Sequence, residues 1–141
     1  MNGRMTERLP AIRLLLLPKD TNAYGTIFGG VILSNIDLAS AVEARKVAPH
    51  RYVTRAMRAV EFHEPVFLGD IVSFYTEMVR VGRTSVTVRV SVEAERWGIP
   101  PSGGGIGGDG ARVKVTEAEV VLVAVNREGR PVPIHPEPLQ A

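Results

Sequence analysis

The sequence of 141 residues contains no cysteine, which excludes disulfide bonds, a thiol nucleophile and cysteine-bound metal sites. It also has no uninterrupted apolar run of about 18 residues, so a membrane-spanning helix is not expected. Residues 1–9 have no apolar signal core, and the short apolar run Leu14–Leu17 is closed by Pro18. These absences predict a cytoplasmic protein with no membrane partner.

The charge pattern does not indicate a nucleic-acid partner. The formal net charge is only +2, and the arginines are scattered along the chain instead of being clustered. His50 and His135 are isolated from other metal-ligating residue types, so no metal site is expected. The length favours one folded domain over residues 1–141, with a flexible polar segment at residues 1–8.

Hydrophobic periodicity predicts one long helix and about five strands. The helix is expected at Val31–Val47, which has no internal glycine or proline and ends before Pro49. Short turns between the later strands favour antiparallel pairing, which gives an α+β fold with one helix against one sheet. The expected strands are Leu9–Leu17, Tyr52–Phe62, Ile71–Val81, Thr84–Glu95 and Val113–Val125, with a short edge at Arg130–Ile134.

The predicted helix is apolar on most of its sides, which is typical of a helix enclosed by other structure. A single sheet covers one side of a helix. We therefore expect further cover from a second copy of the chain, in a dimer or a larger assembly.

The candidate chemistry lies in residues 18–44. A polar turn containing Asn22 leads to Gly29 and Gly30, where the helix is expected to begin with amides that have no intrahelical acceptor and can bind an oxyanion. Asp37 follows in the helix as a carboxylate that can activate water or attack a carbonyl. Plainer interpretations remain for each: an ion-paired or satisfied acid for Asp37, a turn-holding side chain for Asn22, and a tight loop for the two glycines.

The run DTNAYGTIFGG at residues 20–30, followed by Asp37, resembles the hotdog-fold acyl-CoA thioesterases of the cytosolic acyl-CoA hydrolase type. Glu61–Pro65, Gly69-Asp70 and Arg83–Ser85 also resemble segments of that family, in the same order. The resemblance covers roughly residues 9–134. Its motif is more specific than any lone glycine pattern.

The resemblance implies a hotdog fold, in which a long central helix is wrapped by an antiparallel sheet of about five strands. It also implies dimers that join two sheets edge to edge, further assembled as trimers of dimers. The implied substrate is an acyl-CoA, hydrolysed to coenzyme A and a fatty acid, which places the protein in fatty acid metabolism. Asp37 matches the catalytic aspartate, as general base or as nucleophile, and Asn22 matches the catalytic asparagine, with one supplied by each subunit. No cofactor or metal is implied.

The substrate-binding candidates lie outside this run. Thr54 is on the strand after the helix and can face the site. Arg58 and Arg83 are candidates for the phosphates of coenzyme A because a guanidinium suits phosphate geometry. Thr84 and Ser85 offer hydroxyl and backbone groups beside Arg83. For each arginine, the alternative is a solvated surface residue.

The segment Trp97–Gly110 departs from the family pattern, because this inter-strand stretch holds seven glycines. It lacks the Gly-Lys-Ser or Gly-Lys-Thr ending of a phosphate loop and is interpreted as a flexible connection. Two other functions remain open. One is a hotdog module that binds acyl-CoA as a ligand sensor without turnover. The other is a hydratase or dehydratase, which is disfavoured because residues 20–44 contain no histidine.

Overall fold

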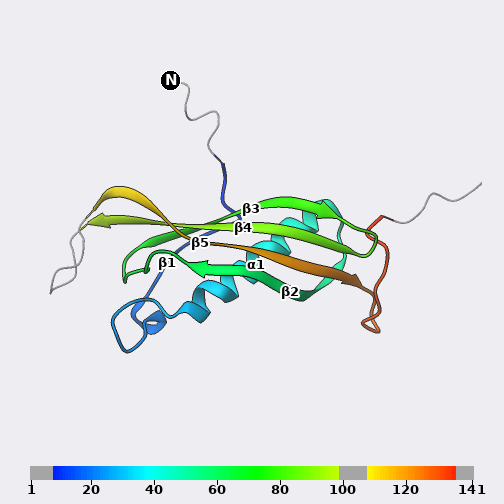
Figure 1. Ribbon diagram of the computed structural model, residues 1–141, viewed down its shortest axis with the longest axis horizontal. Coiled ribbons are helices and arrows are strands. Elements are labelled where there is room, and N and C mark those ends of the chain that lie inside the picture. Colours follow the sequence, from blue (N-terminus) through cyan, green and yellow to red (C-terminus); the bar gives the residue numbers. More distant parts are fainter. Residues whose placement is uncertain (1–7, 99–107, 136–141) are drawn as a thin grey trace, which may run out of the picture.

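The computed structural model describes residues 8–98 and 108–135, which form a five-stranded sheet and one long helix (Figure 1). All neighbouring strands are antiparallel, in the order β1-β3-β4-β5-β2. The α+β class and the antiparallel sheet with a single long helix are confirmed. In chain order the elements are β1 (Ile12–Leu15), a 3₁₀ turn (Pro18–Asp20), α1 (Gly29–Val47), β2 (Arg51–Phe62), β3 (Ile71–Val81), β4 (Ser85–Gly98) and β5 (Gly108–Val125).

The core lies between α1 and the face of the sheet that the helix covers (Figure 1). The alternation expected for β4 is confirmed, because four valines at every second position are fully buried, namely Val86, Val88, Val90 and Val92. Helix α1 contributes Ile32 and Ile36 to the same core, with 1% and 0% of their surface exposed. Burial of apolar side chains from both layers supplies the main driving force for this packing.

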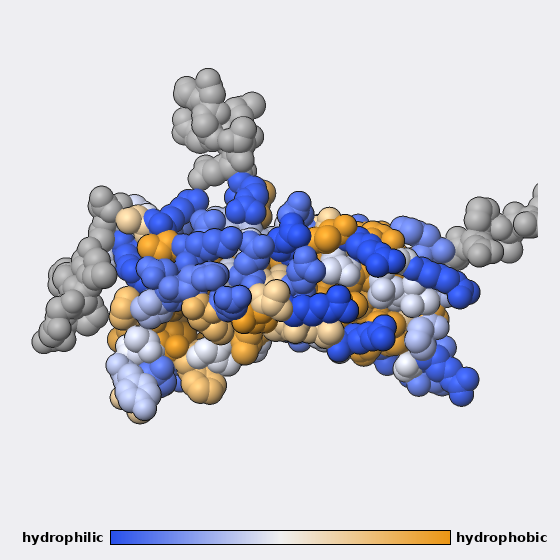
Figure 2. All heavy atoms as spheres, in the orientation of Figure 1, coloured by the Kyte–Doolittle hydropathy of each residue, from blue (hydrophilic) through white to orange (hydrophobic). Residues whose placement is uncertain are grey.

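The sheet covers only one side of α1. On its other side Leu38 and Val42 keep 58% and 40% of their surface exposed within a single chain. Figure 2 shows hydrophobic residues exposed toward the helix and the loop before it, while the visible sheet surface is mainly charged. The helix therefore has an apolar flank that the chain's own sheet does not cover.

The predicted first strand, Leu9–Leu17, is too long, because only Ile12–Leu15 pairs with β3. The chain then turns away at Pro18, and the Asp20 amide donates to the Leu17 carbonyl (2.8 Å) in the 3₁₀ turn. The predicted short edge at Arg130–Ile134 is also wrong as a strand, since it makes only an isolated bridge between Pro131 and Val125.

The β4–β5 hairpin extends further than the alternation predicted. Pairing continues through Trp97 opposite Asp109 and Gly98 opposite Gly108, so both ends of the expected Trp97–Gly110 connection belong to strands. The indole of Trp97 lies over Gly110, where a Cβ would come within 2.1 Å of the ring. Only glycine fits beneath it. Residues 99–107 of the expected connection, like residues 1–7, lie outside the described residues.

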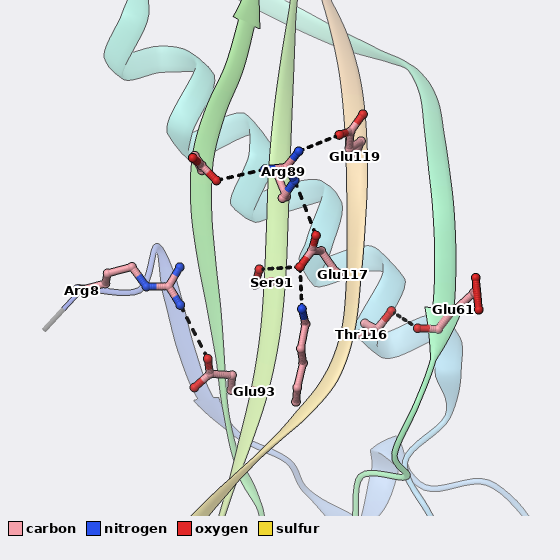
Figure 3. Close-up of polar contacts among 10 residues, drawn as sticks. Arg8, Glu61, Arg89, Ser91, Glu93, Thr116, Glu117 and Glu119 are labelled. Carbon is pink, nitrogen blue, oxygen red and sulfur yellow. Dashed lines mark hydrogen bonds and ion pairs between the residues drawn. The ribbon is translucent and has the colours of Figure 1, made fainter.

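The sheet face away from α1 carries a ladder of charged side chains (Figure 3). Arg89 on β4 contacts Glu77 at 3.3 Å, Glu119 at 3.1 Å and Glu117 at 3.5 Å. Opposite charges on adjacent strands of a solvated face stabilise each pair only modestly. Of the helices in residues 8–98 and 108–135, none is long and apolar enough to cross a membrane.

The sheet ends in two unequal edges. β1 is four residues long, whereas β2 runs for twelve residues from Arg51 to Phe62 and pairs on one side only, with β5. A long edge strand with unpaired backbone groups is a ready template for pairing with another strand. Strand β2 lies beside the uncovered flank of α1.

Candidate active site

The Asn22 side chain organises the loop that leads into the helix. Its amide nitrogen donates to the Thr26 hydroxyl (2.9 Å), and its oxygen accepts from the backbone amides of Tyr24 (2.8 Å) and Thr26 (3.3 Å). Within one chain, Asn22 therefore holds the turn, as in the plainer interpretation. The same contacts fix the side chain in a half-buried position at the surface of the loop, beside the start of α1.

Asp20 closes the other side of this loop. Its carboxylate accepts a hydrogen bond from the Leu17 amide (2.9 Å), and its backbone carbonyl accepts from the Phe28 amide (2.8 Å). The hydrogen bond from the Leu17 amide holds the pKa of the Asp20 carboxyl below its ordinary value, with a smaller contribution from Lys19. Asp20 thus ties the residue before the helix to the 3₁₀ turn.

Helix α1 begins at Gly29 without a side-chain cap, because its N-cap residue is Phe28. Within the part of the chain that the structure describes, the Gly29 and Gly30 amides have no hydrogen-bond acceptor. Two aromatic rings flank these amides. A Cβ on Gly30 would lie 2.6 Å from the Phe28 ring, and one on Gly29 would lie 3.8 Å from the Phe62 ring. The helix start is therefore a donor site with apolar walls, suited to a developing oxyanion.

Asp37 lies on α1, and the structure brings it together with Thr54 on β2. The Thr54 hydroxyl donates to a carboxylate oxygen of Asp37 at 2.5 Å. Asp37 is half-buried, and the adjacent Leu38 faces outward on the uncovered flank of the helix. A carboxylate held by one donor keeps further lone pairs free to accept a proton from water.

Asp37 does not reach the helix start of its own chain. The seven residues from Gly30 to Asp37 advance about 10 Å along α1. The hydrogen bonds of Asn22 all stay within its own loop. In one chain the candidate acid and the candidate donors are therefore two separate half-sites.

A pocket of about 340 Å³ opens beside the helix start. Its walls come from the loop before α1, the first turn of α1, the end of β2 and the loop after β2. The lining residues are Thr26, Ile27, Gly29, Ile32, Phe62, His63, Glu64, Pro65 and Val66. Sequence analysis assigned no catalytic or binding role to His63 or Phe62. Pro65 marked the end of the strand, but no local pattern indicated that the following loop folds back onto Thr26 and Ile27.

A buried ion pair anchors that loop. Arg96 on β4 contacts Asp70 at 3.2 Å, donates to the Pro65 carbonyl (2.7 Å) and lies over the Phe67 ring, 4.7 Å from its centre. The side chains of Arg96 and Asp70 are only 10% and 5% exposed. In the anchored loop, the Val66 carbonyl accepts a hydrogen bond from the Ile27 amide (2.8 Å). The wall of the pocket is thus built on a charge pair that sequence reasoning did not find.

The other predicted substrate-binding residues lie away from these half-sites in the same chain. Arg58 is opposite Glu119, on the sheet face away from α1. Arg83, Thr84 and Ser85 form the β3–β4 turn, at the opposite end of the molecule from the loop before α1 (Figure 1).

The β3–β4 turn lies at one end of β3, and the loop before β3 lies at the other end. The eleven residues of β3 separate the two by roughly 35 Å. In the turn, the Arg83 and Thr84 carbonyls accept the Ile134 and Ala124 amides. A role for these residues would therefore need contact through another copy of the chain. The described residues hold no cluster of three or more His, Asp or Glu side chains arranged to bind a metal ion.

The fold and the geometry define a class: a helix-and-sheet protein with free backbone donors at its helix start and a separate acid further along the same helix. Residues 24–97 match the Thioesterase superfamily, and the chain belongs to that family. The acyl-CoA thioester hydrolase YciA of Escherichia coli is 38% identical over 120 residues, which cover 85% of this chain and 86% of that protein.

Solved structures agree. Cj0915, a hexameric hotdog fold thioesterase of Campylobacter jejuni, matches with a TM-score of 0.80 and 45% identity, covering 89% of this chain and 90% of that one. HI0827, a hexameric broad specificity acyl-coenzyme A thioesterase, matches with a TM-score of 0.80 and 37% identity, covering 96% and 87%. The expected hotdog fold is confirmed.

Proposed function

We propose that this chain hydrolyses acyl-CoA thioesters to coenzyme A and a carboxylic acid, at a site formed by two copies of the chain. The curated relatives and solved structures to which it is similar carry this activity in their names. The observation that best supports this proposal is the Asp37–Thr54 pair, which lies on the uncovered flank of α1, beside the unpaired edge of β2. Pairing of two such edges would bring the flanks of two helices together.

In the proposed site, Asp37 of one subunit faces the helix start and Asn22 of its partner. Asp37 takes a proton from water as the water oxygen attacks the thioester carbonyl carbon. The amides of Gly29 and Gly30 stabilise the resulting oxyanion. The carbon–sulfur bond then breaks, the carbonyl re-forms, and the coenzyme A thiolate leaves and is protonated. Thr54 orients the Asp37 carboxylate. The reaction requires no cofactor or metal ion.

Association also accounts for the exposed apolar residues. Leu38, Val42 and Val53 lie on the free flank of α1 and on β2, and each is at least 40% exposed in a single chain. Burying them in a second copy would add the cover that the helix lacks. We propose a homodimer as the functional unit, with further assembly into a trimer of dimers like the hexameric neighbours.

The test is complementation between two inactive chains. Asp37→Ala should fold normally and lose nearly all release of free thiol from acyl-CoA, and Asn22→Ala should lose most of it. After subunit exchange, half of the dimers would be mixed and each mixed dimer would have one intact site, so about a quarter of wild-type activity should return. Mass spectrometry should first demonstrate that subunits have exchanged. If activity then does not recover, the shared site is ruled out. Turnover by Asp37→Ala at the wild-type rate would rule out the mechanism.

The sensor alternative predicts a different result. A protein that only binds acyl-CoA would bind substrate tightly and release no thiol at any concentration. Steady thiol release by the wild-type chain, abolished in Asp37→Ala, separates the two functions.

A further inference from the structure

Most of the residues that line the pocket beside Gly29 are apolar. Ile27, Ile32 and Val66 are at most 6% exposed and belong to the core, and the Phe62 ring closes one side. We infer that this pocket holds the acyl chain of the substrate and that Phe62 sets the length of chain it accepts. This inference rests on the proposed function and assigns a substrate part to a named cavity.

The charges around the pocket favour a hydrocarbon over the rest of the substrate. The described lining residues include no lysine or arginine, and their ionisable groups are His63 and Glu64. The phosphates of coenzyme A carry several negative charges and would need cationic partners. The carboxylate of Glu64 would instead repel them. An alkyl chain needs only apolar surface, which the isoleucines, Val66 and Phe62 provide.

The geometry connects this pocket to the reacting carbonyl. Gly29 belongs both to the pocket wall and to the proposed oxyanion site, so a carbonyl oxygen bound there places its carbon at the pocket mouth. The acyl chain continues from that carbon past the Phe62 ring, which lies 3.8 Å from where a Gly29 Cβ would be. The thiol carrier leaves in the other direction, toward the partner subunit.

Phe62 is the wall that can change without loss of the fold. It ends β2 and keeps 47% of its surface exposed, whereas Ile32 and Val66 are 1% and 4% exposed. The volume of about 340 Å³ lies at the lower end of the range of about 300–1,000 Å³ for small-molecule pockets. The pocket therefore suits short and medium acyl chains, and each added methylene should tighten binding about fourfold until the space is filled.

The experiment measures binding without turnover. Calorimetry on Asp37→Ala protein gives dissociation constants for coenzyme A and for acetyl-, butyryl-, hexanoyl-, octanoyl- and dodecanoyl-CoA. The same series is repeated with Phe62→Trp, which fills the pocket, and with Phe62→Ala, which enlarges it. Val79→Ala is the matched control, because Val79 is also a half-exposed apolar strand residue, 42% exposed, and does not line the pocket.

Three results support the inference. Affinity rises with chain length and then levels off. Phe62→Trp leaves coenzyme A binding unchanged but weakens the octanoyl ester at least tenfold, and Phe62→Ala moves the levelling-off point to longer chains. The inference is overturned if Phe62→Trp weakens coenzyme A and all its esters by one common factor, because the carrier would then occupy the pocket, or if neither variant changes any constant. Thiol release by the wild-type chain tests the proposed function separately, so either idea can fail alone.

Discussion

The Thr54 hydroxyl donates a 2.5 Å hydrogen bond to the Asp37 carboxylate, joining the strand that follows the helix to the one acid in the first two-thirds of that helix. Thr54 lies on the side of β2 that faces α1, opposite Leu122, which is 1% exposed, but Thr54 itself is exposed. The contact fixes the rotamer of a carboxylate that otherwise has solvent on its outer side. In the proposed reaction the carboxylate must meet a water molecule at one angle, so its orientation is part of the chemistry.

Thr54→Val removes this donor and keeps the shape of the side chain. We expect kcat to fall roughly ten- to a hundredfold with KM little changed, because misorientation of a catalytic group affects the chemical step more than ground-state binding. Thr54→Ser should recover much of the loss. Thr87→Val is the matched control. Thr87 is on β4, opposite Val121 of β5, on the sheet face away from α1. Steady-state kinetics with one acyl-CoA decides the matter, and an equal loss in the control would contradict the orienting role.

Much of the fold could be predicted because its signals are local. Gly69-Asp70 and Gly82 bracket β3, and its predicted bounds, Ile71–Val81, are the observed ones. The predicted strand Thr84–Glu95 stopped short of Gly98, where β4 ends, and the next inward position after Ala94 holds an arginine. That position does continue the alternation: Arg96 points to the side of the buried valines, and Asp70 neutralises it from a loop 26 residues away in sequence. A pattern in one strand cannot predict a distant partner.

The site divides in the same way. Asn22, Gly29, Gly30 and Asp37 could be picked out because the chemistry of each is visible in its own segment. The pocket could not, because its walls meet through contacts between separate segments, such as the bridge of Thr26 with Phe67. The placement of Arg83 at the far end of β3 follows from strand length, which keeps it away from Asp37 and the helix start of its own chain.

The Arg96–Asp70 pair should be among the most stability-sensitive contacts of the chain. Arg96→Met leaves the Asp70 carboxylate buried without its cation, which we expect to lower the free energy of unfolding by about 3–5 kcal/mol. Adding Asp70→Asn should recover part of the loss, because an amide oxygen still accepts the Phe67 amide.

Arg89→Met is the matched control for Arg96→Met. Arg89 also contacts several carboxylates, but its side chain is 36% exposed, so its loss should lower the free energy of unfolding much less than the loss of Arg96 does. Urea unfolding of the four proteins gives these values. Equal costs for Arg96 and Arg89, or no recovery in the double variant, would show that the buried pair does not anchor the loop.

Asp20 predicts how the loop responds to acid. The Leu17 amide hydrogen bond lowers the pKa of the folded-state carboxyl, so this contact stabilises the fold above the unfolded-state pKa and is lost as the pH falls through the lower folded-state value. The window therefore lies below about pH 4. We expect Asp20→Ala to have a lower urea midpoint than wild type at pH 7, with the difference shrinking toward pH 2. A difference that stays constant with pH would assign the effect to packing rather than to the carboxylate.

The two glycines that begin α1 should respond differently to the same substitution. Alanine favours a helix over glycine by up to about 1 kcal/mol, so Gly29→Ala, whose methyl would meet the Phe62 ring at 3.8 Å, should match or exceed wild-type stability. Gly30→Ala offers the same gain but would place its methyl 2.6 Å from the Phe28 ring, which must then move. We therefore expect Gly30→Ala to be less stable than Gly29→Ala.

A double variant isolates the cause of that difference. Phe28 is 58% exposed, so Phe28→Ala removes the obstructing ring at small cost to the core. In the Phe28→Ala background the two glycine substitutions should have equal effects on the urea midpoint, because both then act through helix propensity alone. A gap that persists without the ring would mean that Gly30 is required for close approach of another group to its backbone, and not because Phe28 lies over it.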